Sequence, residues 1–159
     1  MNTIRLDGTW QVRHEPFTRK GEEDLAVVSK AEGGWIPAQV PGEIHLDLMR
    51  AGQMPDPSFS TNMPDCRWVE TKSWWYRTTF EVDDAFLAHE RQELVFDGLD
   101  LFAQVFLNGK LIGECADAFV PQVLDVKPTL QSGKNVLVVR LTAGSELSLD
   151  ATPAGQNQP

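Results

Sequence analysis

Two aspartates, Asp97 and Asp100, form the closest pair of carboxylates at the end of a predicted strand. Such a pair can act as general acid and general base when both groups line a cleft and one has a raised pKa. The Asp97-Gly98 sequence is also typical of a turn, in which aspartate accepts hydrogen bonds from backbone N–H groups. The turn is the simpler explanation, so we interpret this pair as structural.

A loop over residues 53–67 is rich in proline and carries a second group of polar side chains. It contains Asp56, Asn62 and Asp65, whose oxygens are the ligand type that calcium prefers. Calcium loops space several aspartates regularly, and no such ladder is present, so we predict no metal site. Long loops in compact domains tend to be functional or to cover a neighbour. Asp56 and Asn62 are therefore candidate contacts for a substrate or another domain.

Three tryptophans, Trp68, Trp74 and Trp75, could form a platform on which a sugar ring stacks. Side chains alternate along a strand, so Trp74 and Trp75 are expected on opposite faces of a sheet. We predict that one of them enters the core and that the other points outward, toward solvent or a neighbouring domain. Contact with the core or with a domain is favoured over contact with sugar.

No cofactor site follows from the cysteines and histidines. Cys66 and Cys115 form no C-x-x-C motif, which leaves zinc binding and thioredoxin-like chemistry without support. We expect two reduced, partly buried thiols, and the alternative of a disulfide would need Cα atoms within about 7 Å. The histidines are scattered along the chain, and a joint role is not expected for His14, His45 and His89.

Length and charge restrict the function classes. The 159 residues correspond to one domain. The formal charge of −9, from 23 acidic and 14 basic residues, argues against nucleic acid and against an anionic membrane surface as partners. No run approaches the roughly 20 apolar residues of a membrane-spanning helix. The first residues do not resemble a secretion signal, so a cytoplasmic location is expected for the chain as written.

The expected strands surround an antiparallel centre. Residues 74–82, 94–100 and 103–113 are rich in aromatic and β-branched residues. Asn108-Gly109 predicts a two-residue hairpin turn, because both residues tolerate positive φ. Residues 136–141 predict a strand buried on both faces. Further extended segments are expected at 4–12, 25–28, 35–42 and 119–126, those at 25–28 and 35–42 as edge segments.

One short helix near residues 44–51 interrupts the strand pattern, and Gly52 is placed to end it. Short strands separated by turn signals predict an all-β fold, a β-sandwich of the jelly-roll kind, over residues 1–141. Residues 142–159 contain few apolar residues and predict a linker or disordered tail.

Motifs in a fixed order make the chain similar to a known family. It resembles the N-terminal, sugar-binding-type domain of glycoside hydrolase family 2, with its galactose-binding-like jelly roll, and within that family the β-mannosidase branch. The Pro-Gly…His-Leu-Asp-Leu…Ala-Gly…Pro-Asp-Pro run is specific to this branch. The motifs that carry the resemblance lie at residues 6–10, 35–42, 44–48, 51–57, 62, 68–69, 75–77, 80, 94–100, 103–109 and 130–137.

The resemblance implies a retaining glycosidase that removes terminal β-mannose with two carboxylates about 5–5.5 Å apart. In the family both carboxylates lie on a separate (β/α)₈ barrel, so no catalytic residue is carried over to this chain. The family's Gly-Trp-Asp-Trp-Gly segment is also absent. Ser58, where the family often has an aromatic residue, and residues 116–119 depart from the pattern and affect only the loops.

The resemblance implies a non-catalytic domain that packs against the catalytic barrel of the same full-length protein. The contact would involve the loop of residues 56–68 and an outward tryptophan, which together would help to wall the mannose pocket. A second hypothesis is an independent carbohydrate-binding module that binds a β-mannoside or oligosaccharide by itself. A third is a scaffold whose tail joins unrelated partners. The residues proposed for substrate or domain contact are Asp56, Asn62, Trp68, Trp74 and Trp75.

Overall fold

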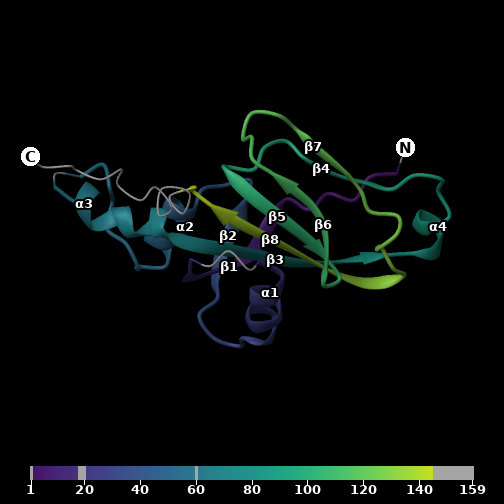
Figure 1. Ribbon diagram of the computed structural model, residues 1–159, viewed down its shortest axis with the longest axis horizontal. Helices are drawn as coiled ribbons and strands as arrows, with labels where there is room; N and C mark the ends of the chain where they lie inside the picture. Colours follow the sequence, from purple (N-terminus) through teal and green to yellow (C-terminus); the bar gives the residue numbers. More distant parts are fainter. Residues whose placement is uncertain (1, 18–20, 60, 145–159) are drawn as a thin grey trace, which may run out of the picture.

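The computed structural model describes residues 2–17, 21–59 and 61–144. Two antiparallel sheets form a sandwich (Figure 1), one with the strand order β2-β1-β3-β8-β5-β6 and one with β4-β7. The strands are β1 Gly8–Pro16, β2 Ile36–Val40, β3 Lys72–Val82, β4 Glu93–Phe96, β5 Phe102–Leu107, β6 Lys110–Cys115, β7 Gln122–Asp125 and β8 Gly133–Thr142. The helices are α1 Gly21–Lys30, α2 Ile44–Arg50, α3 Met63–Cys66 and α4 Asp84–Leu87, with a 3₁₀ turn η1 at Arg67–Thr71. The predicted all-β sandwich is confirmed.

The long strands β3 and β8 form the centre of the six-stranded sheet. They pair antiparallel from Trp74 opposite Leu141 to Val82 opposite Gly133. Side chains of β8 are buried on both faces over Leu137–Arg140, as expected for its continuous apolar run. The hairpin between β5 and β6 turns at Asn108 and Gly109, whose φ angles are 50° and 81°. This is the positive-φ geometry that Asn-Gly predicts.

The short helix α2 begins and ends where the sequence predicts. After Arg50 the chain turns at Gly52, with a φ of 68°. The N–H of Gly52 donates to the Met49 carbonyl at 3.0 Å, and the N–H of Gln53 donates to the Leu48 carbonyl at 2.9 Å. This pair of bonds is a Schellman motif, which needs a residue with positive φ.

The buried carboxylate of Asp47 fastens α2 to the edge strand β2. Its Oδ1 accepts from the backbone N–H of Gln39 at 3.1 Å and from Nη1 of Arg50 at 2.7 Å. Leu48 is fully buried in the same place. The helix is therefore fixed both by apolar burial and by a charge-assisted link to the sheet.

The prediction of an edge strand at residues 25–28 is wrong, because this stretch belongs to helix α1. Three acidic residues occupy the first turn and Lys30 the last, which favours a helix through its macrodipole. Leu25 and Val28, three residues apart, lie on one helical face and are buried. The apolar run at residues 25–28 was predicted to be extended, although its two buried residues are three positions apart, as on one face of a helix.

Two apolar clusters lie on opposite faces of the six-stranded sheet. Figure 1 shows α1 on one side of this sheet and β4 and β7 on the other. The smaller one lies under α1 and contains Leu25, Val28, Trp75, Phe106 and Val138. The larger one lies on the face that β4 and β7 cover, and its buried members are Trp10, Val12, Ala38, Leu48, Met54, Cys66, Val69, Trp74, Leu99, Ala103, Val105, Leu137 and Val139. Below, these are called the α1 face and the Trp74 face.

The predicted boundary at residue 141 falls inside β8, which continues to Thr142. The predicted tail from residue 145 onward lies outside the described residues. None of the helices within residues 2–17, 21–59 and 61–144 combines the length and the apolar character that crossing a membrane requires.

Candidate functional site

The loop of residues 56–68, called the 56–68 loop, is held by its own polar side chains. Oδ1 of Asp56 accepts from the N–H of Ser58 at 2.8 Å and from its Oγ at 2.6 Å. These two hydrogen bonds lower the pKa of Asp56, since they favour the charged carboxylate. Asp56 thus forms an Asx turn, and Ser58, one of the departures from the family pattern, is the donor that completes it.

Asn62 lies against the same turn. Its Nδ2 donates to the backbone carbonyl of Asp56 at 3.0 Å, and its backbone N–H donates to the Phe59 carbonyl at 3.2 Å. The structure therefore brings Asp56 and Asn62 together, as parts of the loop's internal framework. Further along, the buried Sγ of Cys66 lies 3.6 Å from the Pro55 carbonyl.

Both cysteines are free thiols. Burial raises the pKa of Cys66, and the charges of Asp65 and Asp56 add to that effect. Burial also raises the pKa of Cys115 on β6. A raised pKa reduces the thiolate fraction, which makes both groups weak nucleophiles. In the described part of the chain, no three His, Cys, Asp or Glu side chains gather in a metal-binding arrangement.

Trp68 and Trp74 form an aromatic cluster with His14 at the base of the loop. The ring centroids of Trp68 and Trp74 are 5.8 Å apart, and His14 meets both rings edge-on at 5.4 and 5.3 Å. Nε1 of Trp74 donates to the Val69 carbonyl at 2.9 Å. His14 enters because β1 pairs with β3 so that His14 is opposite Trp74. No spacing of residues along the chain signals this long-range contact.

The environment of this cluster disfavours a charged imidazole. Burial lowers the pKa of His14, and the positive charge of Lys72 lowers it further, whereas the negative charge of Glu15 opposes part of this effect. A neutral imidazole beside two indoles leaves a largely uncharged aromatic surface. Trp68 is half-buried whereas Trp74 is buried, so Trp68 is the ring of the pair that keeps more of its surface accessible.

The prediction that one of Trp74 and Trp75 points outward is wrong, although the two do lie on opposite faces. Trp75 is fully buried on the α1 face and stacks on Phe106 with centroids 6.0 Å apart. The physical reason is α1, which covers the face that would otherwise meet solvent. Trp75 is therefore a core residue and not a contact for substrate or another domain.

The tip of the 56–68 loop exposes two apolar side chains that the sequence analysis did not single out. Phe59 is 71% exposed and Met63 is 59% exposed. The sequence does contain a signal for them, because Phe59 and Met63 are large apolar residues in a loop made mostly of proline and polar residues. Together with Trp68 they form what is called here the loop surface.

A second exposed apolar group lies on the outer side of the two-stranded sheet. Val95 and Val123 are cross-strand partners and are 55% and 56% exposed. Val120 and Phe119 extend the group, and Phe119 is 93% exposed. These four residues are called the β4–β7 patch. Exposed apolar groups of this kind are typical of interaction surfaces.

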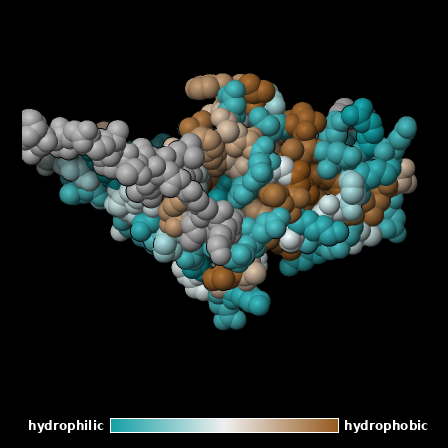
Figure 2. Space-filling model, in the orientation of Figure 1, coloured by the Kyte–Doolittle hydropathy of each residue, from teal (hydrophilic) through white to brown (hydrophobic). Residues whose placement is uncertain are grey.

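A cavity of about 1260 Å³ is lined by the Trp74 face of the six-stranded sheet, by β4 and by residues 2–7, which are called the 2–7 segment. Figure 2 shows hydrophobic residues between hydrophilic ones on the half of the molecule that holds β4, β6 and β7. Asp97 and Asp100 are exposed at its rim. Gly98 between them approaches the Ala118 carbonyl so closely that a Cβ would lie 2.8 Å from its oxygen. This packing agrees with a structural role for the stretch.

The chain is similar to β-mannosidases. It is 42% identical over 107 residues to beta-mannosidase B of Aspergillus terreus, a match that covers 66% of this chain and 13% of the relative. It is 34% identical over 137 residues to beta-mannosidase B of Thermothelomyces thermophilus, covering 86% of this chain and 14% of that protein. The chain thus spans only about an eighth to a seventh of the length of these relatives. The predicted resemblance to the β-mannosidase branch is confirmed.

Solved structures agree with these relatives. The crystal structure of beta-D-mannosidase from Dictyoglomus thermophilum matches with a TM-score of 0.80 and 35% identity over 98% of this chain and 17% of that chain. A beta-glucuronidase from an uncultured Clostridium species, at 24% identity and a TM-score of 0.63, covers 86% of this chain and 21% of its own and shows a likeness in fold. The sequence model of one family, described as glycosyl hydrolase 2 galactose-binding domain-like, matches residues 10–154. The chain belongs to the galactose-binding domain-like family of glycosyl hydrolase 2.

Proposed function

We propose that this chain is the non-catalytic domain of a β-mannosidase, in which it docks on the catalytic barrel of the same protein and helps to wall the mannose pocket. The observation that carries the docking proposal is the loop surface. Phe59 and Met63 are exposed at the tip of a loop whose base is fixed by the Asp56 turn and the Trp68–Trp74 contact. A loop that its own hydrogen bonds already hold in one conformation loses less conformational entropy when it binds a partner.

The support for β-mannosidase as the parent activity is the match to β-mannosidases several times longer than this chain. Hydrolysis with retention needs two carboxylates about 5–5.5 Å apart across one bond. The carboxylates that the sequence analysis weighed for this role, Asp97 and Asp100, are exposed at the cavity rim. We expect the purified 159-residue chain not to hydrolyse 4-nitrophenyl β-D-mannoside. Turnover that survives removal of contaminating enzyme would contradict a non-catalytic role.

The docking proposal is tested in the full-length protein with two matched double variants. Phe59→Ser with Met63→Ser changes the loop surface, whereas Val95→Ser with Val123→Ser changes the β4–β7 patch. We expect the loop variant to raise KM for the chromogenic mannoside and to lower the thermal stability of the full-length protein, without destabilising the isolated chain. A larger effect from the patch variant would instead place the barrel on the outer side of the two-stranded sheet.

An independent carbohydrate-binding module is the second candidate function, and the His14–Trp68–Trp74 cluster favours it. Aromatic rings that keep accessible surface are the groups on which sugar faces pack. The test is a titration of the isolated chain with mannose and mannobiose, followed by tryptophan fluorescence and calorimetry. Saturable binding at millimolar Kd or tighter, about −4 kcal/mol, that Trp68→Ala abolishes would favour the module. Absence of binding would leave the docking role as the better account.

A further inference from the structure

The turn between β5 and β6 contains a pair of residues that can react with each other. Asn108 and Gly109 have φ angles of 50° and 81°, the geometry that a two-residue hairpin turn demands. In an Asn-Gly pair the backbone nitrogen of glycine can attack the side-chain amide of asparagine, because glycine has no side chain that hinders the approach. Of the five asparagines in the sequence, only Asn108 precedes a glycine. The residue types that the turn requires therefore also carry a reactive amide.

The side-chain amide of Asn108 is held through both its oxygen and its nitrogen. Oδ1 accepts from the backbone N–H of Val136 at 2.9 Å. Nδ2 donates to the Thr129 carbonyl at 3.0 Å and to Oδ1 of Asn135 at 2.8 Å. Attack by Gly109 would make Cγ tetrahedral and move Oδ1 and Nδ2 away from these partners. The three hydrogen bonds therefore oppose the reaction while the turn is folded.

Asn135 is the fixed member of this arrangement, and it is fully buried. Its Oδ1 also accepts from the backbone N–H of Gln131 at 3.0 Å, and its Nδ2 donates to the carbonyls of Gln131 and Gly133 at 2.8 and 3.0 Å. Both donors and both acceptor positions of this amide are used. Asn108 and Asn135, called the amide pair below, thus join the hairpin to the turn that precedes β8.

Loss of the amide nitrogen from Asn108 would damage the same contacts. An aspartate carboxylate accepts hydrogen bonds and donates none, so at this half-buried position it would face the Thr129 carbonyl and Oδ1 of Asn135 without a proton between them. Unpaired polar groups of this kind lower stability. An isoaspartate would add a carbon to the main chain of a turn whose length sets the register of the two strands. Either product weakens the end of the β5–β6 hairpin.

We propose that Asn108 is a site of spontaneous modification, gated by Asn135, that converts to aspartate or isoaspartate only when the amide pair separates. The nitrogen of Gly109 loses its proton to solvent base and forms a bond to Cγ of Asn108. The Cγ–Nδ2 bond then breaks, and the amide nitrogen takes up a proton and leaves as ammonia. Water opens the resulting succinimide ring at either carbonyl. Because both products weaken the hairpin, the modification is a one-way mark on chains that have opened here. The site is independent of the proposed docking role.

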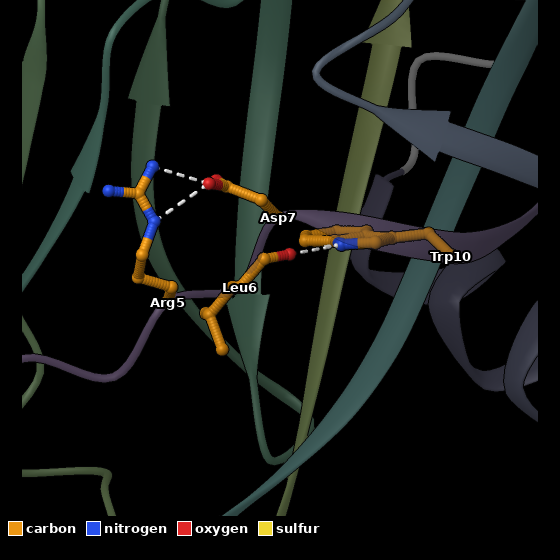
Figure 3. A network of polar contacts seen from close by, with 4 residues as sticks. All are labelled: Arg5, Leu6, Asp7 and Trp10. Carbon is orange, nitrogen blue, oxygen red and sulfur yellow. Dashed lines mark hydrogen bonds and ion pairs between the residues drawn. The ribbon is translucent and has the colours of Figure 1, made fainter.

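Asp7 offers a comparison within the same chain, because it also precedes a glycine. An Asp-Gly pair closes the same ring with loss of water and reopens to isoaspartate. Figure 3 shows the Asp7 carboxylate bound by the guanidinium of Arg5, whose Nε donates to Oδ2 at 2.9 Å. The two side chains are 51% and 81% exposed. An exposed ion pair restrains its members weakly, so ring closure at Asp7 should respond less to folding than ring closure at Asn108.

The first test measures both sites in the 159-residue chain at mildly alkaline pH. One sample is native, and the other is in urea above the unfolding midpoint. Peptide mapping by mass spectrometry follows Asn108, and chromatographic separation of isoaspartyl peptides follows Asp7. Since three hydrogen bonds must open together, we expect Asn108 to convert about 100-fold more slowly in the native chain than in urea. Asp7 should be slowed less.

The second test uses variants of the amide pair. Asn135→Ser should raise the native conversion rate of Asn108 about tenfold. Gln131→Ala is the matched control, because its Nε2 donates to the Lys134 carbonyl in the same turn and not to Asn108, and it should leave the rate unchanged. Asn108→Asp reproduces one product directly and should lower Tm by about 5 °C.

Four results would overturn the proposal. A native rate at Asn108 equal to the rate in urea would mean that the side-chain hydrogen bonds do not restrain the amide, and this comparison needs only the wild-type chain. Equal slowing of Asp7 would mean that folding protects both sites in a general way. Equal acceleration by Asn135→Ser and Gln131→Ala would mean that a loosened turn, and not the amide pair, controls the rate. A wild-type Tm for Asn108→Asp would mean that the modification leaves the hairpin intact.

Discussion

The two faces of the six-stranded sheet are closed in different ways, although neighbouring residues of the same strands build them. Trp75 and Val138 lie on the α1 face, where a ten-residue helix covers a small cluster. Trp74 and Val139 lie on the Trp74 face, where a larger cluster borders a cavity of about 1260 Å³. A short local helix can complete a small core, whereas a broad face needs a second sheet of matching width.

The largest expected effect is on the α1 face. Trp75→Ala removes the largest fully buried side chain of the protein's described part and should lower the free energy of unfolding by about 3–5 kcal/mol. Urea unfolding of the isolated chain measures this loss. Phe119→Ala is the control, because Phe119 is 93% exposed and its truncation should change stability by no more than about 0.5 kcal/mol. A loss below about 1 kcal/mol for Trp75→Ala would mean that α1 does not hold a dry core.

A matched pair of valines compares the two faces directly. Val138 and Val139 are neighbours on β8, are 6% and 2% exposed, and belong to different clusters. Val138→Ala should cost about 1–3 kcal/mol, and Val139→Ala should cost less. The reason is that Val139 borders the existing cavity and already lacks partner atoms on one side. Equal losses would show that the Trp74 face is as tightly packed as the α1 face.

Helix α2 packs at one end of the Trp74 face, and its C-terminal turn can be tested with a substitution that introduces backbone strain and no clash. Gly52 has a φ of 68° and no heavy atom within 4 Å of a built Cβ. Gly52→Ala should therefore cost about 1 kcal/mol through its φ angle and not through a clash. Gly33→Ala is the matched control, since Gly33 also has open space but no positive φ. If both variants lower Tm equally, the Schellman motif does not stabilise α2.

Features that depend on residues close together in the sequence could be predicted, whereas features that depend on contacts between distant segments could not. Local signals located the Asn108-Gly109 hairpin and the end of α2 at Gly52, because turn geometry requires those residue types. The prediction of an outward tryptophan was wrong because Trp75 is covered by α1, a segment about fifty residues away in the sequence. Residues 25–28 of α1 were themselves predicted to form a strand.

The candidate site divides in the same way. The turn at Asp56 is local and its loop was predicted, whereas the contact of His14 with Trp68 and Trp74 depends on the register of β1 with β3. The exposure of Phe59 and Met63 was not predicted either. Whether an apolar side chain of a loop meets solvent depends on where the whole loop lies against the sheet, and composition alone does not determine that.

The smallest expected effect concerns the edge of the Trp74 face, where His14 lies. Burial, Lys72 and Arg13 lower the pKa of His14 below 6.5, so the unfolded chain binds a proton at a higher pH than the folded chain. The stability that His14 contributes is therefore fully present above pH 6.5 and is lost as the pH falls through the lowered pKa. The loss should be small, since His14 is partly exposed to solvent and the added charges are screened.

Comparing the wild-type chain with His14→Gln isolates this contribution from the many carboxylates that titrate at lower pH. We expect the difference in Tm between the two proteins to be constant above pH 6.5 and to shift in favour of His14→Gln as the pH falls below it. NMR titration of the imidazole gives the folded pKa directly. A folded pKa at or above 6.5 would mean that the neighbouring rings do not desolvate the imidazole of His14. The Trp74 face would then be more open to water at this end of the β1–β3 pair than the α1 face is, and the contrast between the two faces would be sharper still.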